Sequence, residues 1–206
     1  MKILTPSTTF IDNTVILGNN VTIFENNRIE ANTVIGDNCT LLPNNHIIGC
    51  IVGQNVTMES TTATNCTIEK DCTIGPFARL RPNTHLAKGC KVGNFVEIKN
   101  STLGEGCKVS HLAYVGDADL GKNCNVGCGV IFVNFNGKTK NRTVVGDNCF
   151  LGSNCNIIAP VHIANDVYVC AGTTVTDNLE KGDFAIGRTR QEVKKDRAYQ
   201  YLKEKD

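Results

Sequence analysis

The sequence predicts an all-β fold, a parallel β-helix in which short strands wind into a stack of coils. Aliphatic residues recur at every sixth position, a period that neither an α-helix nor a single strand produces. The first run is Leu17, Ile23, Ile29, Ile35, Leu41 and Ile47, and later runs span residues 68–98 and 145–175. Three such hexapeptide edges close one triangular coil, so about nine coils fit between residues 12 and 176.

The corners between the edges support this prediction. The residues after each aliphatic position are rich in Gly, Asn and Asp, as in the Gly-Asp-Asn sequences at 36–38 and 146–148. These residue types tolerate the positive φ angles that tight corners require. Each repeat therefore contains residues suited to the corner that follows its strand.

The cysteines fit the same repeat. Strand side chains alternate, so the position two residues before each aliphatic residue also points inward, and nine of the eleven cysteines occupy it. Free cysteine packs as a small hydrophobe. The sequence has no Cys-x-x-Cys pair followed by another at zinc-ligand spacing, and its number of cysteines is odd. We therefore expect eleven free thiols and no metal, with Cys128 and Cys170 off this phase, at corners.

Two segments depart from the repeat. The step from Phe132 to Val145 is thirteen residues, so residues 134–141 are expected to protrude as a loop. After Asp183 the repeat stops, and residues 184–206 are expected to form a tail with a short helix. The chain is predicted to be a single domain, 1–206, with the β-helix over 12–176.

Composition narrows the function classes. The chain has 206 residues, 41% of them hydrophobic, and its 21 Lys and Arg against 20 Asp and Glu leave a net charge of +1. This balance argues against nucleic acid or anionic lipid as a partner. The beginning of the chain lacks the apolar run of a signal peptide, and no stretch has the length of a membrane span. We therefore expect a cytoplasmic protein without membrane insertion.

The histidines separate into two kinds. His46, His85 and His162 occupy outward positions on coils too far apart for one metal ion, which argues against a zinc enzyme on this fold. His111 instead sits at a corner. Residues one coil apart stack ~4.8 Å from each other. The column through His111 is Asn94, His111, Cys128, Ser153 and Ala171, all small or polar apart from the histidine.

Two further columns lie near His111. One corner column carries Phe77, Phe95 and Leu112, and exposed apolar groups of this size indicate a partner surface. At the other end of the same face, Arg81 and Lys99 stack on successive coils. Two stacked cations suit a phosphate or a carboxylate, although a solvated basic pair has the same spacing.

Three stretches carry a more specific resemblance. Residues 75–82 (GPFARLRP), 92–99 (VGNFVEIK) and 111–118 (HLAYVGDA) are similar to the C-terminal acetyltransferase half of the bacterial bifunctional N-acetylglucosamine-1-phosphate uridylyltransferase / glucosamine-1-phosphate N-acetyltransferase. The likeness continues through residues 171–176 and Arg188. It implies a left-handed β-helix, an exception to the usual right-handed crossover. It also implies a homotrimer with the active site between subunits.

The resemblance assigns roles residue by residue. It implies that His111 is the general base that accepts a proton from the sugar amine. Sugar-phosphate binding is assigned to Arg81, Lys99, Tyr114 and Asn125. Contacts with the co-substrate acetyl-CoA are assigned to Cys128, Asn134, Phe135, Lys140, Ser153, Ala171 and Arg188. Members of this family usually carry Tyr at the position of Phe135 and Ala at those of Cys128 and Cys170.

The function implied is glucosamine-1-phosphate N-acetylation, which feeds UDP-N-acetylglucosamine and cell-envelope biosynthesis. The Gly-rich nucleotide loop and metal-binding acids of the uridylyltransferase half have no counterpart in this sequence, so synthesis of a UDP-sugar is not expected. Two alternatives stay open. One is an acyltransferase for a different amino-sugar acceptor. The other is a non-catalytic β-helical scaffold in which His111 and Lys99 are incidental.

Overall fold

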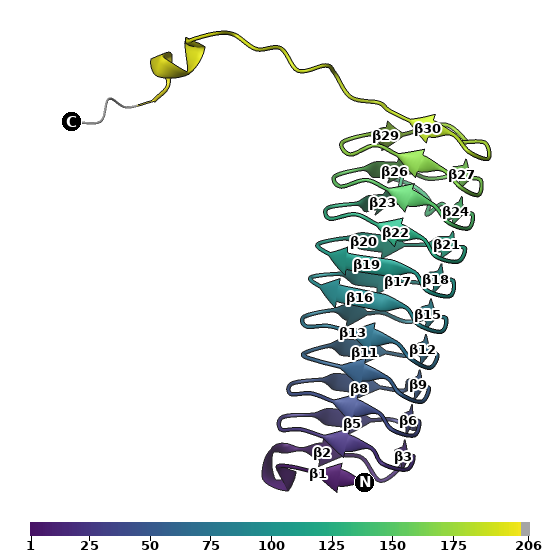
Figure 1. The fold of residues 1–206 in the computed structure, drawn as a ribbon. Helices are drawn as coiled ribbons and strands as arrows, with labels where there is room; N and C mark the ends of the chain where they lie inside the picture. The colour runs from purple at the N-terminus through teal and green to yellow at the C-terminus, as the bar shows by residue number, and fades with distance from the viewer. Residues whose placement is uncertain (203–206) are drawn as a thin grey trace.

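The computed structural model describes residues 1–202 and is a stack of three-sided coils that rises from the N-terminus (Figure 1). Every strand within the three sheets pairs in parallel with the strands one coil above and below. Within the described residues, sheet A has 11 strands, sheet B has 10 and sheet C has 9. The predicted parallel β-helix is therefore confirmed, with about ten coils instead of about nine.

The three sheets form the three faces of the prism. Sheet A comprises β1 (Lys2–Ile3), β4 (Thr22–Ile23), β7 (Thr40–Leu41), β10 (Thr57–Met58), β13 (Thr73–Ile74), β16 (Lys91–Asn94), β19 (Lys108–His111), β22 (Asn125–Val126), β25 (Phe150–Leu151), β28 (Tyr168–Val169) and β30 (Phe184–Ala185). Sheet B comprises β2 (Phe10–Ile11), β5 (Arg28–Glu30), β8 (His46–Ile48), β11 (Thr62–Thr64), β14 (Arg79–Leu80), β17 (Glu97–Lys99), β20 (Tyr114–Gly116), β23 (Ile131–Val133), β26 (Asn156–Ile158) and β29 (Thr174–Val175). Sheet C comprises β3 (Ile16–Leu17), β6 (Val34–Ile35), β9 (Ile51–Val52), β12 (Thr67–Ile68), β15 (His85–Leu86), β18 (Thr102–Leu103), β21 (Ala118–Leu120), β24 (Thr143–Val145) and β27 (His162–Ile163).

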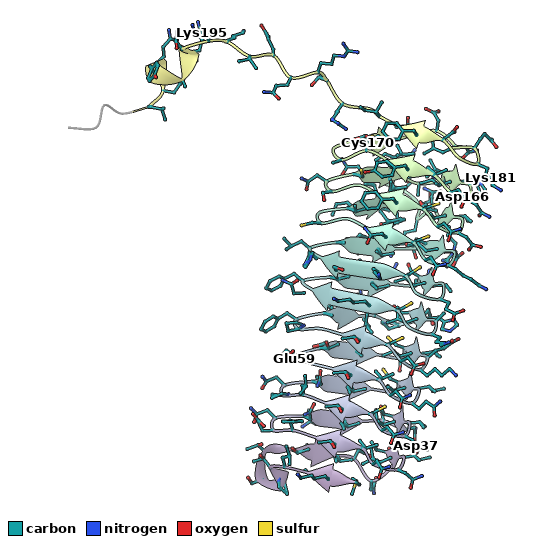
Figure 2. All side chains as sticks on the ribbon, in the orientation of Figure 1. Asp37, Glu59, Asp166, Cys170, Lys181 and Lys195 are labelled. Atoms are coloured by element: carbon teal, nitrogen blue, oxygen red, sulfur yellow. The ribbon has the colours of Figure 1, made fainter. Side chains whose placement is uncertain are left out.

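The core follows the sixfold repeat. Ile23, Ile29, Leu41 and Leu80 are fully buried, because each repeated aliphatic side chain points into the prism. The nine cysteines on the inward phase are buried as well, and their thiols donate to carbonyl groups, as from Cys107 Sγ to the neighbouring coil. All eleven cysteines are free thiols. Cys170, placed at a corner by its phase, is also buried, and Figure 2 shows it in the last coils. Cys128 is half-buried.

The corners use asparagine ladders. Many corner asparagines adopt left-handed φ angles, such as 55° at Asn20 and 57° at Asn38. Their side chains link successive coils, since Asn20 Nδ2 donates to Asn38 Oδ1 at 3.2 Å. An amide can both donate and accept, so asparagine continues such a ladder in both directions.

The β-helix extends past the predicted range at both ends. Strand β1 pairs with β4, and β30 pairs with β28. The 3-10 helix η1 (Pro6–Thr8) lengthens the first coil and breaks the sixfold period, which hides β1 in the sequence. Residues 186–202 then leave the coils, and the predicted short helix is a single 3-10 turn, η2 (Arg197–Gln200). Figure 2 places Lys195 on this extended tail, away from the coils.

The protruding loop is present where the sequence predicts it. Residues 134–142 connect β23 to β24, and the loop closes on itself because Asn141 N–H donates to the Asn134 carbonyl at 2.7 Å. An isolated antiparallel bridge between Phe135 and Lys140 continues this closure. The loop is therefore a short hairpin that stands on the corner between sheets B and C.

Candidate active site

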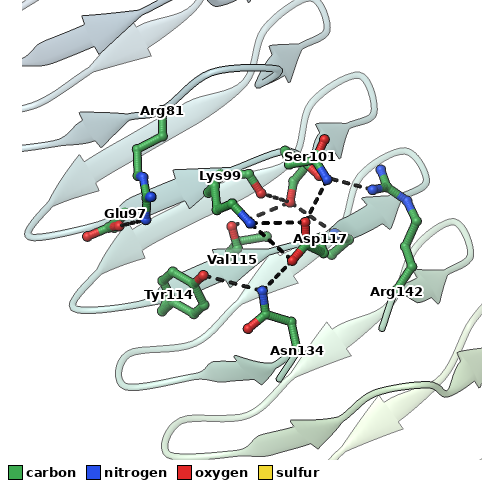
Figure 3. A network of polar contacts seen from close by, with 11 residues as sticks. Arg81, Glu97, Lys99, Ser101, Tyr114, Val115, Asp117, Asn134 and Arg142 are labelled. Atoms are coloured by element: carbon green, nitrogen blue, oxygen red, sulfur yellow. Dashed lines mark hydrogen bonds and ion pairs between the residues drawn. The ribbon is translucent and has the colours of Figure 1, made fainter. Parts of the chain in front are cut away.

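Two cations lie at the carboxyl end of sheet B (Figure 3). Arg81 directly follows β14, and its Nη1 lies 2.8 Å from Glu97 Oε1. Lys99 ends β17 one coil above, and its Nζ lies 3.3 Å from both carboxylate oxygens of Asp117. Both members of the Lys99–Asp117 pair are largely buried, with side-chain exposures of 17% and 7%. The predicted stacking of Arg81 and Lys99 is thus present.

Tyr114 lies on the same face, next to these cations. A Cβ atom at Gly116 would collide with the Tyr114 hydroxyl, so glycine lets the ring lie over the following turn of strand. In this position the Tyr114 Oη accepts a hydrogen bond of 3.4 Å from Asn134 Nδ2. The phenol thus connects the sheet face to the root of the protruding loop.

The loop adds a third cation. The side chain of Lys99, within hydrogen-bonding reach and of like charge, lowers the pKa of Lys140, and the charge of Arg81 adds to this effect. The resemblance implies a contact of Lys140 with acetyl-CoA, and within one chain its side chain lies beside Lys99. We call Arg81, Lys99 and Lys140 the cation cluster.

His111 lies at the carboxyl end of sheet A, where β19 ends and the chain turns through a corner toward Tyr114 in sheet B. Its ring is exposed, and its Nδ1 lies 2.8 Å from Asn94 Oδ1 on the strand below. An amide oxygen only accepts, so the neutral ring carries its proton on Nδ1 and leaves the Nε2 lone pair free. About 10 Å of strand separates this corner from the cation cluster.

The register of β19 and β22 places Cys128 one coil above His111, and backbone hydrogen bonds link the coils above it. Asn154 N–H donates to the Cys128 carbonyl and Gly172 N–H donates to the Ser153 carbonyl, each at 2.8 Å. At the top, Arg188 Nη1 donates to the Ala171 carbonyl at 3.0 Å. The Arg188 side chain also lines a hollow of ≈ 470 Å³ together with Ile186, Thr189, Arg190 and Gln191. The corner between sheets A and B thus carries one line of small residues that ends at arginine.

One chain does not bring all the predicted residues together. Asn125 lies on the outer face of sheet A, paired with Phe150, around the corner from Tyr114. Phe135 stands on the loop with 55% of its surface exposed. Among the residues 1–202, no group of three or more His, Cys, Asp or Glu is arranged to hold a metal ion. None of the helices described there is long and apolar enough to cross a membrane.

Asp117 is a site residue that the sequence analysis did not single out. Its carboxylate accepts hydrogen bonds from Lys99, Asn100 and Asn134. Burial raises the pKa of Asp117, but these hydrogen bonds and the charge of Lys99 outweigh it and hold the pKa below its ordinary value. The available signal was its place in the corner ladder, where Asp117 follows Asn83 and Asn100 at left-handed φ.

The apolar corner column carries strained backbone. Phe77, Phe95 and Leu112 have φ angles of 58°, 57° and 46°, which cost bulky residues ~1–2 kcal/mol each. Their side chains are nonetheless 59%, 57% and 56% exposed, and the rings of Phe77 and Phe95 stack at 5.6 Å. Large apolar side chains are therefore both strained and exposed at these three corners.

The fold places the chain in the class of left-handed β-helix proteins to which known acyltransferases belong. LpxA, a UDP-N-acetylglucosamine acyltransferase from Bacteroides fragilis, matches 84% of this chain and 67% of its own with a TM-score of 0.57. The sequence identity is 16%, so this likeness concerns the fold, and it confirms the predicted left-handed β-helix.

The family follows from the sequence comparison. Residues 62–184 match the model of the GMPPB C-terminal domain, and the chain belongs to this family. The bifunctional protein GlmU of Clostridium kluyveri is 42% identical over 93% of the chain, and that of Alkaliphilus oremlandii is 44% identical over 94%. The chain spans 42% and 43% of the length of these two relatives. The predicted relationship to the bifunctional family is confirmed.

Proposed function

We propose that the chain is a glucosamine-1-phosphate N-acetyltransferase that uses acetyl-CoA and forms N-acetylglucosamine-1-phosphate. The observation that carries this proposal is that His111, with its free Nε2, ends sheet A at the corner where sheet B begins, while the cation cluster lies at the far end of sheet B. A base and a phosphate site are the two features that an amino-sugar phosphate needs in an acetyl acceptor. The relationship to GlmU proteins supports the same acceptor.

The chemistry assigned to His111 is proton transfer. The sugar amine nitrogen attacks the thioester carbonyl carbon, a C–N bond forms, and the C–S bond breaks. The amine proton passes to His111 Nε2 and then to the departing CoA sulfur. Asn94 holds the ring with Nδ1 protonated, so Nε2 accepts the proton. This transfer requires no metal ion.

The cation cluster is the proposed phosphate site. Arg81 and Lys99 carry counter-ions, whereas the lowered pKa of Lys140 shows a charge whose main neighbours are cations. A phosphate there would relieve the repulsion between Lys99 and Lys140. Tyr114 adds a hydroxyl on the same face.

The acetyl-CoA arm is proposed to follow the corner column from His111 past Cys128 and Ser153 to Ala171. Three coils at strand spacing measure ~14 Å, a length that suits an extended pantetheine arm. Arg188 and the hollow beside it would receive the nucleotide end. The free thiols fit a cytoplasmic enzyme, where acetyl-CoA is available.

The proposed enzyme is a homotrimer with sites between subunits. Asn125 lies around the corner from the cation cluster within one chain, so a neighbouring copy must supply it if it contacts the same ligand. The exposed column of Phe77, Phe95 and Leu112 provides the apolar contact.

An acceptor panel tests this proposal. Purified protein, acetyl-CoA and one amine at a time would be assayed for free CoA thiol and, by mass spectrometry, for the acetylated product. Glucosamine-1-phosphate should give the highest kcat/KM, well above glucosamine, which lacks the phosphate. A preference for a nucleotide-linked amino sugar would assign another acceptor. If no amine in the panel causes release of the CoA thiol, the result would favour the non-catalytic scaffold.

A further inference from the structure

Asp117 lies between Lys99 of the cation cluster and Asn134 at the start of the loop (Figure 3). Its Oδ1 accepts from Asn100 Nδ2 at 2.6 Å, and its Oδ2 accepts from Asn134 Nδ2. Both oxygens also face Lys99 Nζ. One buried carboxylate therefore contacts side chains from the coil below and from the start of the loop.

The backbone of Asp117 holds the other end of the loop. Thr143 N–H, directly after the loop, donates to the Asp117 carbonyl at 3.1 Å. Asp117 N–H donates in turn to the Lys99 carbonyl at 3.0 Å. Both roots of the loop thus attach to the residue that also binds Lys99.

We propose that Asp117 is the positioning residue of this site, which fixes Lys99 and anchors the 134–142 loop so that Lys140 stays beside Lys99. The part that concerns phosphate rests on the proposed function, whereas the anchoring of the loop does not. Asp117 itself does not touch the substrate.

The carboxylate is suited to this role because it only accepts hydrogen bonds. An asparagine at this corner would continue the ladder as donor and acceptor, whereas aspartate draws three donors to one point. It also places a negative charge 3.3 Å from the ammonium group of the largely buried Lys99. The ion pair with Asp117 thus holds the Lys99 side chain in place beside Lys140.

For Asp117→Asn, a purely electrostatic role and a positioning role predict opposite changes in the affinity for phosphate. Removing a negative charge near a phosphate site should tighten phosphate binding if Asp117 is only a competing anion. If Asp117 positions Lys99 and the loop, the same change should weaken it. The variant keeps nearly the same side-chain size, so the contrast is one of charge and hydrogen-bonding pattern.

The experiment compares Asp117→Asn with Asp71→Asn in the full chain. Asp71 is likewise a corner aspartate at left-handed φ (63°), but it is exposed, follows β12 in sheet C, and accepts its hydrogen bond from Asn55 rather than from the loop. One readout is KM for glucosamine-1-phosphate against glucosamine, and the other is the rate of tryptic cleavage after Lys138 and Lys140, followed by mass spectrometry. The melting temperature of each variant is recorded alongside.

In Asp117→Asn we expect KM for glucosamine-1-phosphate to rise at least about tenfold, equivalent to ~1.4 kcal/mol. KM for glucosamine should stay constant, and loop cleavage should accelerate by a similar factor. Asp71→Asn should leave both readouts close to wild type. A lower KM for the phosphorylated sugar, or unchanged loop cleavage, would overturn the proposal.

Two further comparisons keep the result interpretable. If Asp117→Asn unfolds, Asn134→Leu removes the loop contact while leaving the Lys99–Asp117 pair, and loop cleavage must still accelerate. If the wild-type protein does not acetylate glucosamine-1-phosphate, the proposed function fails. The cleavage rates then decide alone whether Asp117 anchors the loop.

Discussion

His111 Nδ1 and Asn94 Oδ1 face each other at 2.8 Å across the paired strands β19 and β16. The contact fixes the orientation of an exposed imidazole ring that has no other side-chain hydrogen bond among residues 1–202. It also selects the tautomer, because the amide oxygen can only accept the Nδ1 proton. Asn94 therefore governs how His111 presents Nε2.

We predict that Asn94→Ala lowers kcat by about 10- to 100-fold, the range that loss of an orienting hydrogen bond costs at metal-bound histidines. The two KM values should change little, because Asn94 holds the ring rather than a substrate. Steady-state kinetics with both substrates varied checks this. An unchanged kcat would show that the ring needs no such partner.

Arg81→Ala and Lys99→Ala should raise KM for glucosamine-1-phosphate, each by the ~1.5–3 kcal/mol of a hydrogen bond to a charged group. KM for acetyl-CoA should stay nearly constant, because its proposed path leads away from the cation cluster. Arg79→Ala is the matched control. Arg79 is exposed on β14, the strand that Arg81 directly follows. Weaker acetyl-CoA binding in Arg81→Ala would contradict the assignment.

Charges in the apolar corner column should dissociate the proposed trimer. Leu112→Asp or Phe95→Asp would place a carboxylate in a desolvated contact, which costs several kcal/mol. Sedimentation should show monomers and activity should fall in parallel. Ile51→Asp, an equally exposed apolar position on sheet C, should leave the assembly intact. Intact trimers in both column variants would refute the placement.

The thiols should divide into one accessible group and ten protected ones. Ten thiols are buried, which shields them from a reagent. In addition, burial raises the pKa of Cys39, and the hydrogen bond with Cys107 raises the pKa of Cys124 to about 12. Cys128 is the half-buried exception. A thiol reagent near neutral pH should therefore modify one cysteine quickly in the native protein, and Cys128→Ala should abolish that phase. The denatured protein should titrate eleven thiols.

Two glycine substitutions should separate stability from function. A Cβ at Gly93 would collide with the Ser110 backbone, so Gly93→Ala should lower the free energy of unfolding by ~1–3 kcal/mol. A Cβ at Gly116 would collide only with the movable Tyr114 side chain, so Gly116→Ala should mainly raise the sugar KM. Calorimetry and kinetics on both variants check this contrast. Equal melting points would contradict it.

The fold was largely predictable because one short repeat determines it. Each coil buries the same positions of the repeat, so the burial of Ile29 and Ile47 can be predicted from local sequence alone. The ends were less predictable. The 3-10 turn at residues 6–8 hides β1, and the step from Val175 to Ala185 hides β30.

The candidate site was predictable where it follows the columns. The register places Asn94 beside His111, as the coil length indicates. The inserted loop has no register, so the approach of Lys140 to Lys99 could not be read from spacing. Asp117 was overlooked because an aspartate in a corner ladder differs from its neighbours only in lacking a donor.

The most direct test of the account measures CoA thiol release from acetyl-CoA and glucosamine-1-phosphate by the wild-type protein and by His111→Ala. The account predicts acetylation by the wild type and a kcat lower by ~10²–10⁴ in the variant, with a nearly unchanged sugar KM. No thiol release by the wild type, or full kcat in His111→Ala, would contradict it.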